Sequence, residues 1–220
     1  KHEIFGLMSY KTQLGIYQAL AIPICYVINP FLSIIPLIGL LLSKSITALI
    51  SAAIGVVFLL RKKIPKLRFS LIYFQTFITL VVLYGISFIF NFPHRLSMRS
   101  GVWISTIKLI AHNLIYGYGV GTFKYIERKM EYSDPYSLYL QIVYALGIFG
   151  IVALFLFLKD KFIGFKNDAL IAQGLFASCL VLVLCGLGYS FMDYPRLTGT
   201  VIVLFGLLTV MKGAESENTL

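Results

Sequence analysis

The sequence predicts an all-α polytopic membrane protein. Hydrophobic residues make up 59% of the 220 residues and charged residues 13%, which is about half the charged share of a soluble domain. Apolar runs with almost no charge recur along the whole chain. Backbone groups in lipid must be satisfied within their own segment, so these runs are expected to be helices. We expect about seven transmembrane helices and one long extracytoplasmic loop that carries an amphipathic helix.

The alternation of apolar runs and polar segments divides the chain into four regions. Residues 1–90 hold the transmembrane helices of the first half, 91–136 the extracytoplasmic loop, 137–212 the helices of the second half and 213–220 a cytoplasmic tail. The chain begins with Lys1 rather than Met. We therefore expect it to be the C-terminal portion of a longer protein.

Four helices are expected in the first half, at 12–28, 31–43, 46–60 and 69–90. The first two are separated by Asn29-Pro30, because proline breaks or kinks a helix. The segment 31–43 is shorter than the 20 residues or so of a full span. Two interpretations stay open here: a span followed by a half-helix, or one long kinked helix.

Charge in the loops predicts the orientation. The loop after residue 60 contains five basic residues and no acid, which marks it as cytoplasmic. This places 91–136 outside, and further helices follow at 137–158, 169–189 and 197–211. The net charge of +10 is then explained by loops that flank membrane helices, because no polar domain gathers the basic residues into a nucleic-acid surface.

Within the long loop, the sequence predicts an amphipathic helix from Ser97 to Asn113, and Ser97 can cap its N-terminus. Apolar residues at helical spacing form one stripe, and polar residues lie opposite. The stripe is Trp103, Ile107, Ile110 and Leu114, and the polar side is Ser105, Lys108 and His112. Such a helix lies along a membrane surface or caps a helix bundle.

Arg99 lies one turn before Trp103 on the same stripe. A guanidinium there reaches the apolar boundary, where the head group of a lipid-linked pyrophosphate would lie, and arginine can hold phosphate through two parallel hydrogen bonds. The alternative is an interfacial arginine that snorkels or stacks on Trp103.

Other parts of the loop also have two interpretations. Gly117, Gly119 and Gly121 either cradle phosphate with their N–H groups or form a flexible turn that lets Phe123 fold back. The acids of the loop, with His112, either include a general base or belong to a solvated mixed-charge segment. The acids are Glu127, Glu131 and Asp134. The three cysteines lie in apolar runs and no metal-binding spacing occurs, so we expect no metal and no cofactor.

Several of these motifs together resemble the O-antigen ligase and polymerase superfamily. The motifs are Arg99-x-x-x-Trp103, Gly117-x-Gly119-x-Gly121-x-Phe123, Asp134-Pro135, Leu138-Tyr139-Leu140-Gln141 and Gly147-Ile148-Phe149-Gly150. The resemblance covers most of the chain. It implies a mostly helical, membrane-embedded glycosyltransferase of the bacterial cytoplasmic (inner) membrane, with an active site on the extracytoplasmic side that moves lipid-linked sugar chains.

The resemblance also implies roles for particular residues. Arg99 would engage the undecaprenyl pyrophosphate of the donor, next to Trp103, and Arg95 and Arg196 would add positive charge without a metal. Family ligases carry a His-Asn pair after Asp-Pro, where this chain has Tyr136 and Ser137. A phenol ordinarily ionises at about pH 10 and is a poor base at neutral pH. The base is therefore sought among Asp134, Glu131 and His112, with Tyr136 kept as a candidate.

The predicted function is polymerisation of polysaccharide repeat units carried on undecaprenyl pyrophosphate. The first alternative is an O-antigen ligase that transfers the glycan to lipid A core, and the second is a membrane transporter. A transporter places polar groups inside its spans, whereas here they collect in the outer segments. The expected partners are the lipid-linked donor, a glycan or lipid A core acceptor and membrane lipids, with no nucleic acid.

Overall fold

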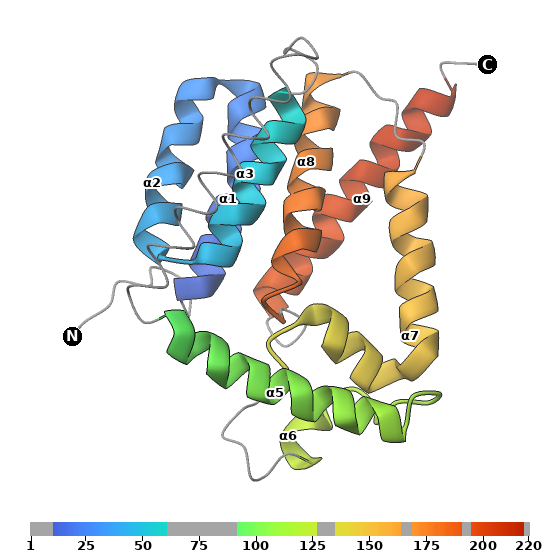
Figure 1. Cartoon of the computed structure of the whole chain (residues 1–220). Helices are drawn as coiled ribbons and strands as arrows, with labels where there is room; N and C mark the ends of the chain where they lie inside the picture. The colour runs from blue at the N-terminus through green and yellow to red at the C-terminus, as the bar shows by residue number, and fades with distance from the viewer. Residues whose placement is uncertain (1–10, 61–91, 127–134, 164–168, 191–194, 218–220) are drawn as a thin grey trace, which may run out of the picture. The chain divides into compact units, whose positions relative to one another are not determined.

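All regular structure that the computed structural model describes is helical, as predicted (Figure 1). It describes residues 11–60, 92–126, 135–163, 169–190 and 195–217, and the helix expected at 69–90 lies outside them. The helices are α1 (Lys11–Ile28), the 3₁₀ helix η1 (Pro30–Ser33), α2 (Ile34–Ser43), α3 (Ile46–Leu60), α5 (Phe92–His112), α6 (Phe123–Ile126), α7 (Leu138–Phe162), α8 (Leu170–Cys185) and α9 (Pro195–Glu217).

The helices belong to two compact units, which are described separately. The first unit consists of residues 1–80, 164–185 and 194–220, and the second of residues 81–163 and 186–193. The first unit therefore holds α1, η1, α2, α3, α8 and α9, and the second holds α5, α6 and α7. The boundary falls directly after α8, so the turn at 186–190 belongs to the second unit.

The first two helices are separate, which rules out one long kinked helix over 12–43. The Asn29 side chain accepts a hydrogen bond from the Phe31 N–H at 3.0 Å, and Pro30 opens η1. Proline suits this place because the first N–H groups of a helix have no partner within it. From η1 the chain turns back, and α2 packs along α1 (Figure 1).

Helix α8 is the centre of the first unit and packs against α1, α3 and α9 (Figure 1). Small residues let the helices approach closely, as is common between membrane helices. A Cβ on Gly55 of α3 would lie 2.5 Å from a methyl group of Val181. The buried Ser178 hydroxyl donates a hydrogen bond to the Leu20 carbonyl of α1 at 2.8 Å.

Helix α7 is broken at Gly147, so the continuous helix predicted over 137–158 is wrong. Gly147 has φ 61° and ψ −147°, which no helix contains. Helical backbone thus covers 138–146 and 148–162. By length and composition, α7 is still long and apolar enough to cross a membrane, and it is the one such helix among the described residues. The other apolar helices are shorter, and the number of spans stays a prediction.

Helix α5 also differs from its prediction. It begins at Phe92 instead of Ser97, with Pro93 in the first turn, where proline is tolerated. Its buried face is formed by Val102, Thr106 and Ile110. Of the predicted stripe, Ile110 belongs to this face, whereas Ile107 at 54% and Leu114 at 44% are exposed. The reason is that α5 has apolar residues on more than one side, and its contact with α7 selects the side that is buried.

Candidate active site

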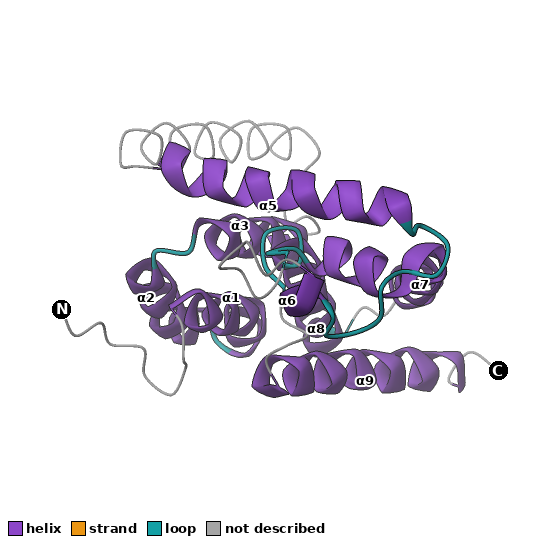
Figure 2. Ribbon diagram, turned by 90° about the horizontal axis from the view of Figure 1, so that it is seen from below, coloured by secondary structure: helices purple, strands orange, loops and turns teal. Residues whose placement is uncertain are grey.

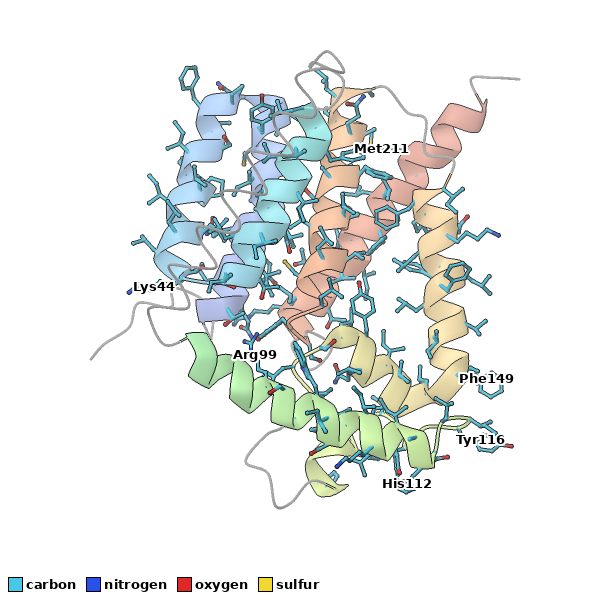
Figure 3. The ribbon with its side chains drawn as sticks, in the orientation of Figure 1. Lys44, Arg99, His112, Tyr116, Phe149 and Met211 are labelled. Carbon is cyan, nitrogen blue, oxygen red and sulfur yellow. The ribbon has the colours of Figure 1, made fainter. Side chains whose placement is uncertain are left out.

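Arg99 is held by two groups within the second unit. Its Nη1 donates a hydrogen bond to the carbonyl oxygen of Gly188 at 3.1 Å. Its guanidinium carbon lies 5.6 Å from the centroid of the Tyr136 ring, within the range of a cation–π contact. Figure 3 labels Arg99 on α5. The side chain is therefore fixed between the turn that follows α8 and the residue that precedes α7 by two positions.

Tyr136 has an unusual backbone conformation. Its φ is 50°, in the left-handed region, which costs a non-glycine residue about 1–2 kcal/mol. Its neighbours Pro135 and Ser137 are both buried, and the Tyr136 side chain packs against the core cluster of the second unit. Such strain persists where the surrounding structure determines the backbone, and it is often found at functional sites.

The turn at 186–190 is attached at three points. The Leu138 N–H donates to the Gly186 carbonyl at 2.9 Å, Arg99 donates to the Gly188 carbonyl, and the Ser190 hydroxyl donates to the side-chain oxygen of Gln141. The carbonyl that holds Arg99 is thus fixed by contacts on either side of it. The arrangement joins α5, the start of α7 and this turn.

Trp103 lies one turn after Arg99 on α5 and is partly buried. Its indole Nε1 is buried, and no residue that the structure describes accepts a hydrogen bond from it. An indole nitrogen can only donate, and a buried donor without an acceptor is unfavourable. Arg99 and Trp103 thus carry two N–H donor groups on consecutive turns of α5, and N–H donors are the groups that hold an oxygen-rich anion.

The glycine-rich segment after α5 fills the break in α7. The Tyr118 N–H donates to the Tyr144 carbonyl at 2.8 Å, the Gly119 N–H donates to the Ala145 carbonyl at 2.9 Å, and the Ile148 N–H donates to the Leu114 carbonyl at 2.8 Å. In an unbroken helix these α7 groups would bond within the helix. In Figure 2 the loop after α5 passes α7 before it reaches α6.

This pairing decides how the Gly117–Gly121 segment is used. The N–H groups of Tyr118 and Gly119 are occupied by α7 carbonyls, so the structure does not support a phosphate cradle there. Phe123 does fold back as expected: it is buried, and its ring meets that of Tyr144 edge to face at 5.1 Å between centroids. The segment is a turn fixed by hydrogen bonds rather than a flexible one.

Two of the glycines are needed because backbone approaches backbone. Gly117 has φ 69° and Gly147 has φ 61°, values that favour glycine. A Cβ on Gly117 would meet the Ala145 carbonyl group, and a Cβ on Gly147 would meet the carbonyl oxygens of Leu114 and Ile115. The two glycine motifs of the sequence are thus the two sides of one contact.

A family model described as O-antigen ligase matches residues 31–155, more than half of the chain. The chain belongs to the O-antigen ligase family. This confirms the resemblance drawn from the motifs. No curated protein and no solved structure matches the chain. The matched region includes Arg99, Trp103, both glycine motifs and the first part of α7 after its break.

The O-antigen ligase family comprises glycosyltransferase-like ligases and polymerases that act on lipid-linked glycans. Membership and the apolar helices together indicate an integral membrane protein. Exposed apolar side chains on α2, α7 and α9 fit this conclusion, because such surfaces are uncommon in monomeric soluble proteins.

The other predicted site residues of this O-antigen ligase family member lie at other positions of α5, near the start of α9 or outside the described residues. His112 is exposed at the end of α5, about 20 Å along the helix axis from Arg99. Arg95 lies on α5 one turn before Arg99. Arg196 is exposed near the start of α9, in the first unit. Glu131 and Asp134 lie outside the described residues.

Three groups of this site were not predicted from the sequence: the Gly188 carbonyl, Ser190 and Gln141. A carbonyl group leaves no trace in a sequence pattern. Gln141 had a usable signal, because it is a polar residue in an otherwise apolar helix, and such residues in membrane segments usually have a partner. Its partner Ser190 is far away in the sequence and could not be inferred from spacing.

Proposed function

We propose that this protein is a glycosyltransferase that acts on glycans linked to undecaprenyl pyrophosphate at the outer face of the bacterial cytoplasmic membrane. The observation that carries the proposal is the fixed Arg99 guanidinium. Trp103, one turn later on α5, adds a buried indole N–H that no described residue accepts. Both groups are donors. Their natural ligand in a family that acts on lipid-linked glycans is the pyrophosphate of the donor.

The reaction needs charge stabilisation more than bond activation. An acceptor hydroxyl attacks the anomeric carbon of the donor sugar, and a new C–O bond forms. The bond from the anomeric carbon to the pyrophosphate oxygen breaks, and its electron pair leaves with the pyrophosphate. Arg99 and Trp103 stabilise the charge that develops on the leaving group. The proton of the hydroxyl passes to a base, for which Asp134 and Glu131 are the candidates, because His112 lies about 20 Å along α5 from Arg99.

Tyr136 is assigned a second role in this proposal. Its ring lies below the Arg99 guanidinium, and the Gly188 carbonyl holds the same side chain by a hydrogen bond. A positioned guanidinium loses less freedom when the pyrophosphate binds. Tyr136 therefore acts as a positioning residue through its ring, instead of serving as the base that a histidine supplies in family ligases.

We favour a repeat-unit polymerase because Tyr136 and Ser137 replace the His-Asn pair of the resembling ligases. An O-antigen ligase that uses lipid A core as acceptor is the second candidate. The family model that matches the chain is described as O-antigen ligase, which favours this second candidate. A transporter is the third reading, and the same experiment decides among them.

The experiment uses the purified protein in liposomes with an undecaprenyl-pyrophosphate-linked repeat unit as donor. We expect release of undecaprenyl pyrophosphate together with a ladder of glycan products on a gel. A single transfer that depends on added lipid A core would identify a ligase instead. Absence of release from any lipid-linked donor would contradict glycosyl transfer and support the transport reading.

A further inference from the structure

The exposed side of α5 is itself divided into two strips. The buried face, with Val102 and Ile110, packs in the core of the second unit. On the outside, Ile104 and Ile107 form an apolar strip and are 55% and 54% exposed. Lys108 and His112, also exposed, form a basic strip next to it, since at about 100° per residue the order around the helix is Ile107, Ile104, Lys108 and His112. The helix thus has a protein side, an apolar side and a polar side.

The apolar strip continues beyond the end of α5 onto the break in α7. Leu114, Ile115 and Tyr116 are exposed, with Tyr116 at 77%. The Ile148 N–H bonds to the Leu114 carbonyl, which joins this loop to the exposed Ile148 and Phe149. Figure 3 labels Tyr116, Phe149 and His112 at this end of α5. We call this surface the apolar rim; it consists of Ile104, Ile107, Leu114, Ile115, Tyr116, Ile148 and Phe149.

The apolar rim is held outward by a fixed backbone. The Tyr118 hydroxyl donates to the Leu109 carbonyl of α5 at 3.0 Å, and the Asn113 side chain donates to the Gly117 carbonyl. With the bonds that close the α7 break, they fix the loop on both of its neighbours. The exposed side chains of Leu114, Ile115 and Tyr116 therefore cannot be hidden by a simple collapse of the loop.

We infer that the apolar rim is a lipid-binding surface, which seats α5 in the interfacial zone of the bilayer with Lys108 and His112 against phospholipid head groups. The two adjacent strips reproduce the change from hydrocarbon to head group. Basic side chains complement anionic phosphates, and a tyrosine at the boundary suits its apolar ring and polar tip. The rim also runs without interruption into the exposed apolar face of α7, which continues through Val152, Phe155 and Leu156.

This placement also sets how deep Arg99 lies relative to the head groups, a step that rests on the proposed function. Lys108 and Arg99 project from opposite sides of α5, because nine residues turn a helix through two and a half turns. If Lys108 faces the head groups, Arg99 lies within about 10 Å of them, one helix diameter, on the side that faces the protein. That is the depth at which the pyrophosphate of a lipid-linked donor lies.

Tryptophan scanning with brominated lipids tests the inference. The chain has one natural tryptophan, Trp103, whose signal is subtracted. Ile107→Trp and Tyr116→Trp are compared with Lys108→Trp, the matched control from the neighbouring position on the same helix. The proteins are placed in vesicles of phosphatidylcholine brominated on its acyl chains and phosphatidylglycerol. All three sites are exposed, and circular dichroism checks that the helical content is unchanged.

We expect the new tryptophans at 107 and 116 to be quenched severalfold more by the brominated chains than the one at 108. We also expect the tryptophan at 108 to be quenched more by aqueous acrylamide. Equal acrylamide quenching at all three positions would overturn the inference, because the rim would then face water. Protection at 107 and 116 from both quenchers would also overturn it and indicate a second copy of the chain on the rim. Neither quenching measurement needs enzymatic activity, so the result can be interpreted even if the proposed function is wrong.

Discussion

Tyr136 stands at the position where family ligases are expected to carry a histidine, and its ring contacts Arg99 instead of supplying an obvious base. Two substitutions distinguish the contribution of the Tyr136 ring from that of its hydroxyl. Tyr136→Phe keeps the ring, and we expect kcat/KM for the donor to stay close to that of the parent. Tyr136→Leu removes the cation–π contact, worth about 0.5–2 kcal/mol, so kcat/KM should fall by about twofold to thirtyfold.

A double-mutant cycle decides whether Tyr136 acts through Arg99. In an Arg99→Ala background, the further loss from Tyr136→Leu should largely disappear, because the two side chains act as one unit. A general structural role would produce the same loss in both backgrounds. If Tyr136→Phe were inactive while folded, the hydroxyl would be the essential group and the positioning role would be wrong.

Trp103 carries a buried N–H that no described residue accepts. Trp103→Phe removes this donor and keeps an aromatic ring. We expect kcat/KM for the donor to fall by about tenfold to 150-fold, because a hydrogen bond to a charged group contributes about 1.5–3 kcal/mol. The midpoint of thermal unfolding should stay close to that of the parent, because no hydrogen bond within the described protein is lost. Unchanged kinetics, or a parallel loss of stability and activity, would show that the indole nitrogen does not meet the substrate.

At the scale of elements, the central feature is the exchange of hydrogen bonds between the α7 break and the loop after α5. Gly147→Ala places a Cβ against the Leu114 and Ile115 carbonyl oxygens in a backbone conformation that only glycine adopts readily. We expect a loss of stability of at least about 1–3 kcal/mol, measured by thermal unfolding in detergent.

Gly101→Ala is the matched control for that substitution. Gly101 lies within α5, and a Cβ there would meet nothing within 4 Å. Alanine should stabilise the helix by about 0.5–1 kcal/mol at this position. A Gly147→Ala protein as stable as the Gly101→Ala protein would mean that the break in α7 is not required.

The helices themselves could largely be predicted from the sequence, and the reason is local. Apolar runs punctuated by Asn29-Pro30 and Ser43-Lys44-Ser45 place α1, α2 and α3 within a few residues. The break in α7 could not be predicted in this way. Gly147 lies inside an apolar run. The backbone groups next to it find their hydrogen-bond partners in a loop about thirty residues earlier in the chain.

The candidate site could likewise be predicted from the sequence only in part. The position of Arg99 on the apolar stripe left two interpretations open, and the resemblance to the O-antigen ligase superfamily gave Arg99 and Trp103 their predicted role. The structure places both on α5. Which apolar residues of α5 pack inside the protein could not be predicted, because Ile104, Ile107 and Val102 are all apolar and only the packing against α7 distinguishes them. The partners of Arg99, namely Tyr136 and the Gly188 carbonyl, come from distant segments, and no spacing rule connects them.

At the scale of the whole molecule, this helical membrane protein of the O-antigen ligase family carries its candidate charge site on α5. The family match covers residues 31–155, and the turn at 186–190, which holds Arg99 through Gly188, lies beyond it. The site therefore depends on a segment that the family model does not include.

Replacing Ser190 by alanine should weaken the attachment of the turn at 186–190 to Gln141. We expect this substitution to raise KM for the donor more than it lowers kcat.

The most direct test of the central claim is the kinetics of undecaprenyl pyrophosphate release by Arg99→Ala, Arg99→Lys and Lys159→Ala in the same liposomes. Lys159 is an exposed cation near the end of α7 and serves as the control for loss of one positive charge. We predict that Arg99→Ala loses at least about a hundredfold in kcat/KM, as expected when a fixed donor to developing charge is removed. Arg99→Lys should recover only part of this loss, because lysine lacks the planar fork, and Lys159→Ala should match the parent. A folded Arg99→Ala protein that releases the carrier at the parent's rate would contradict the account.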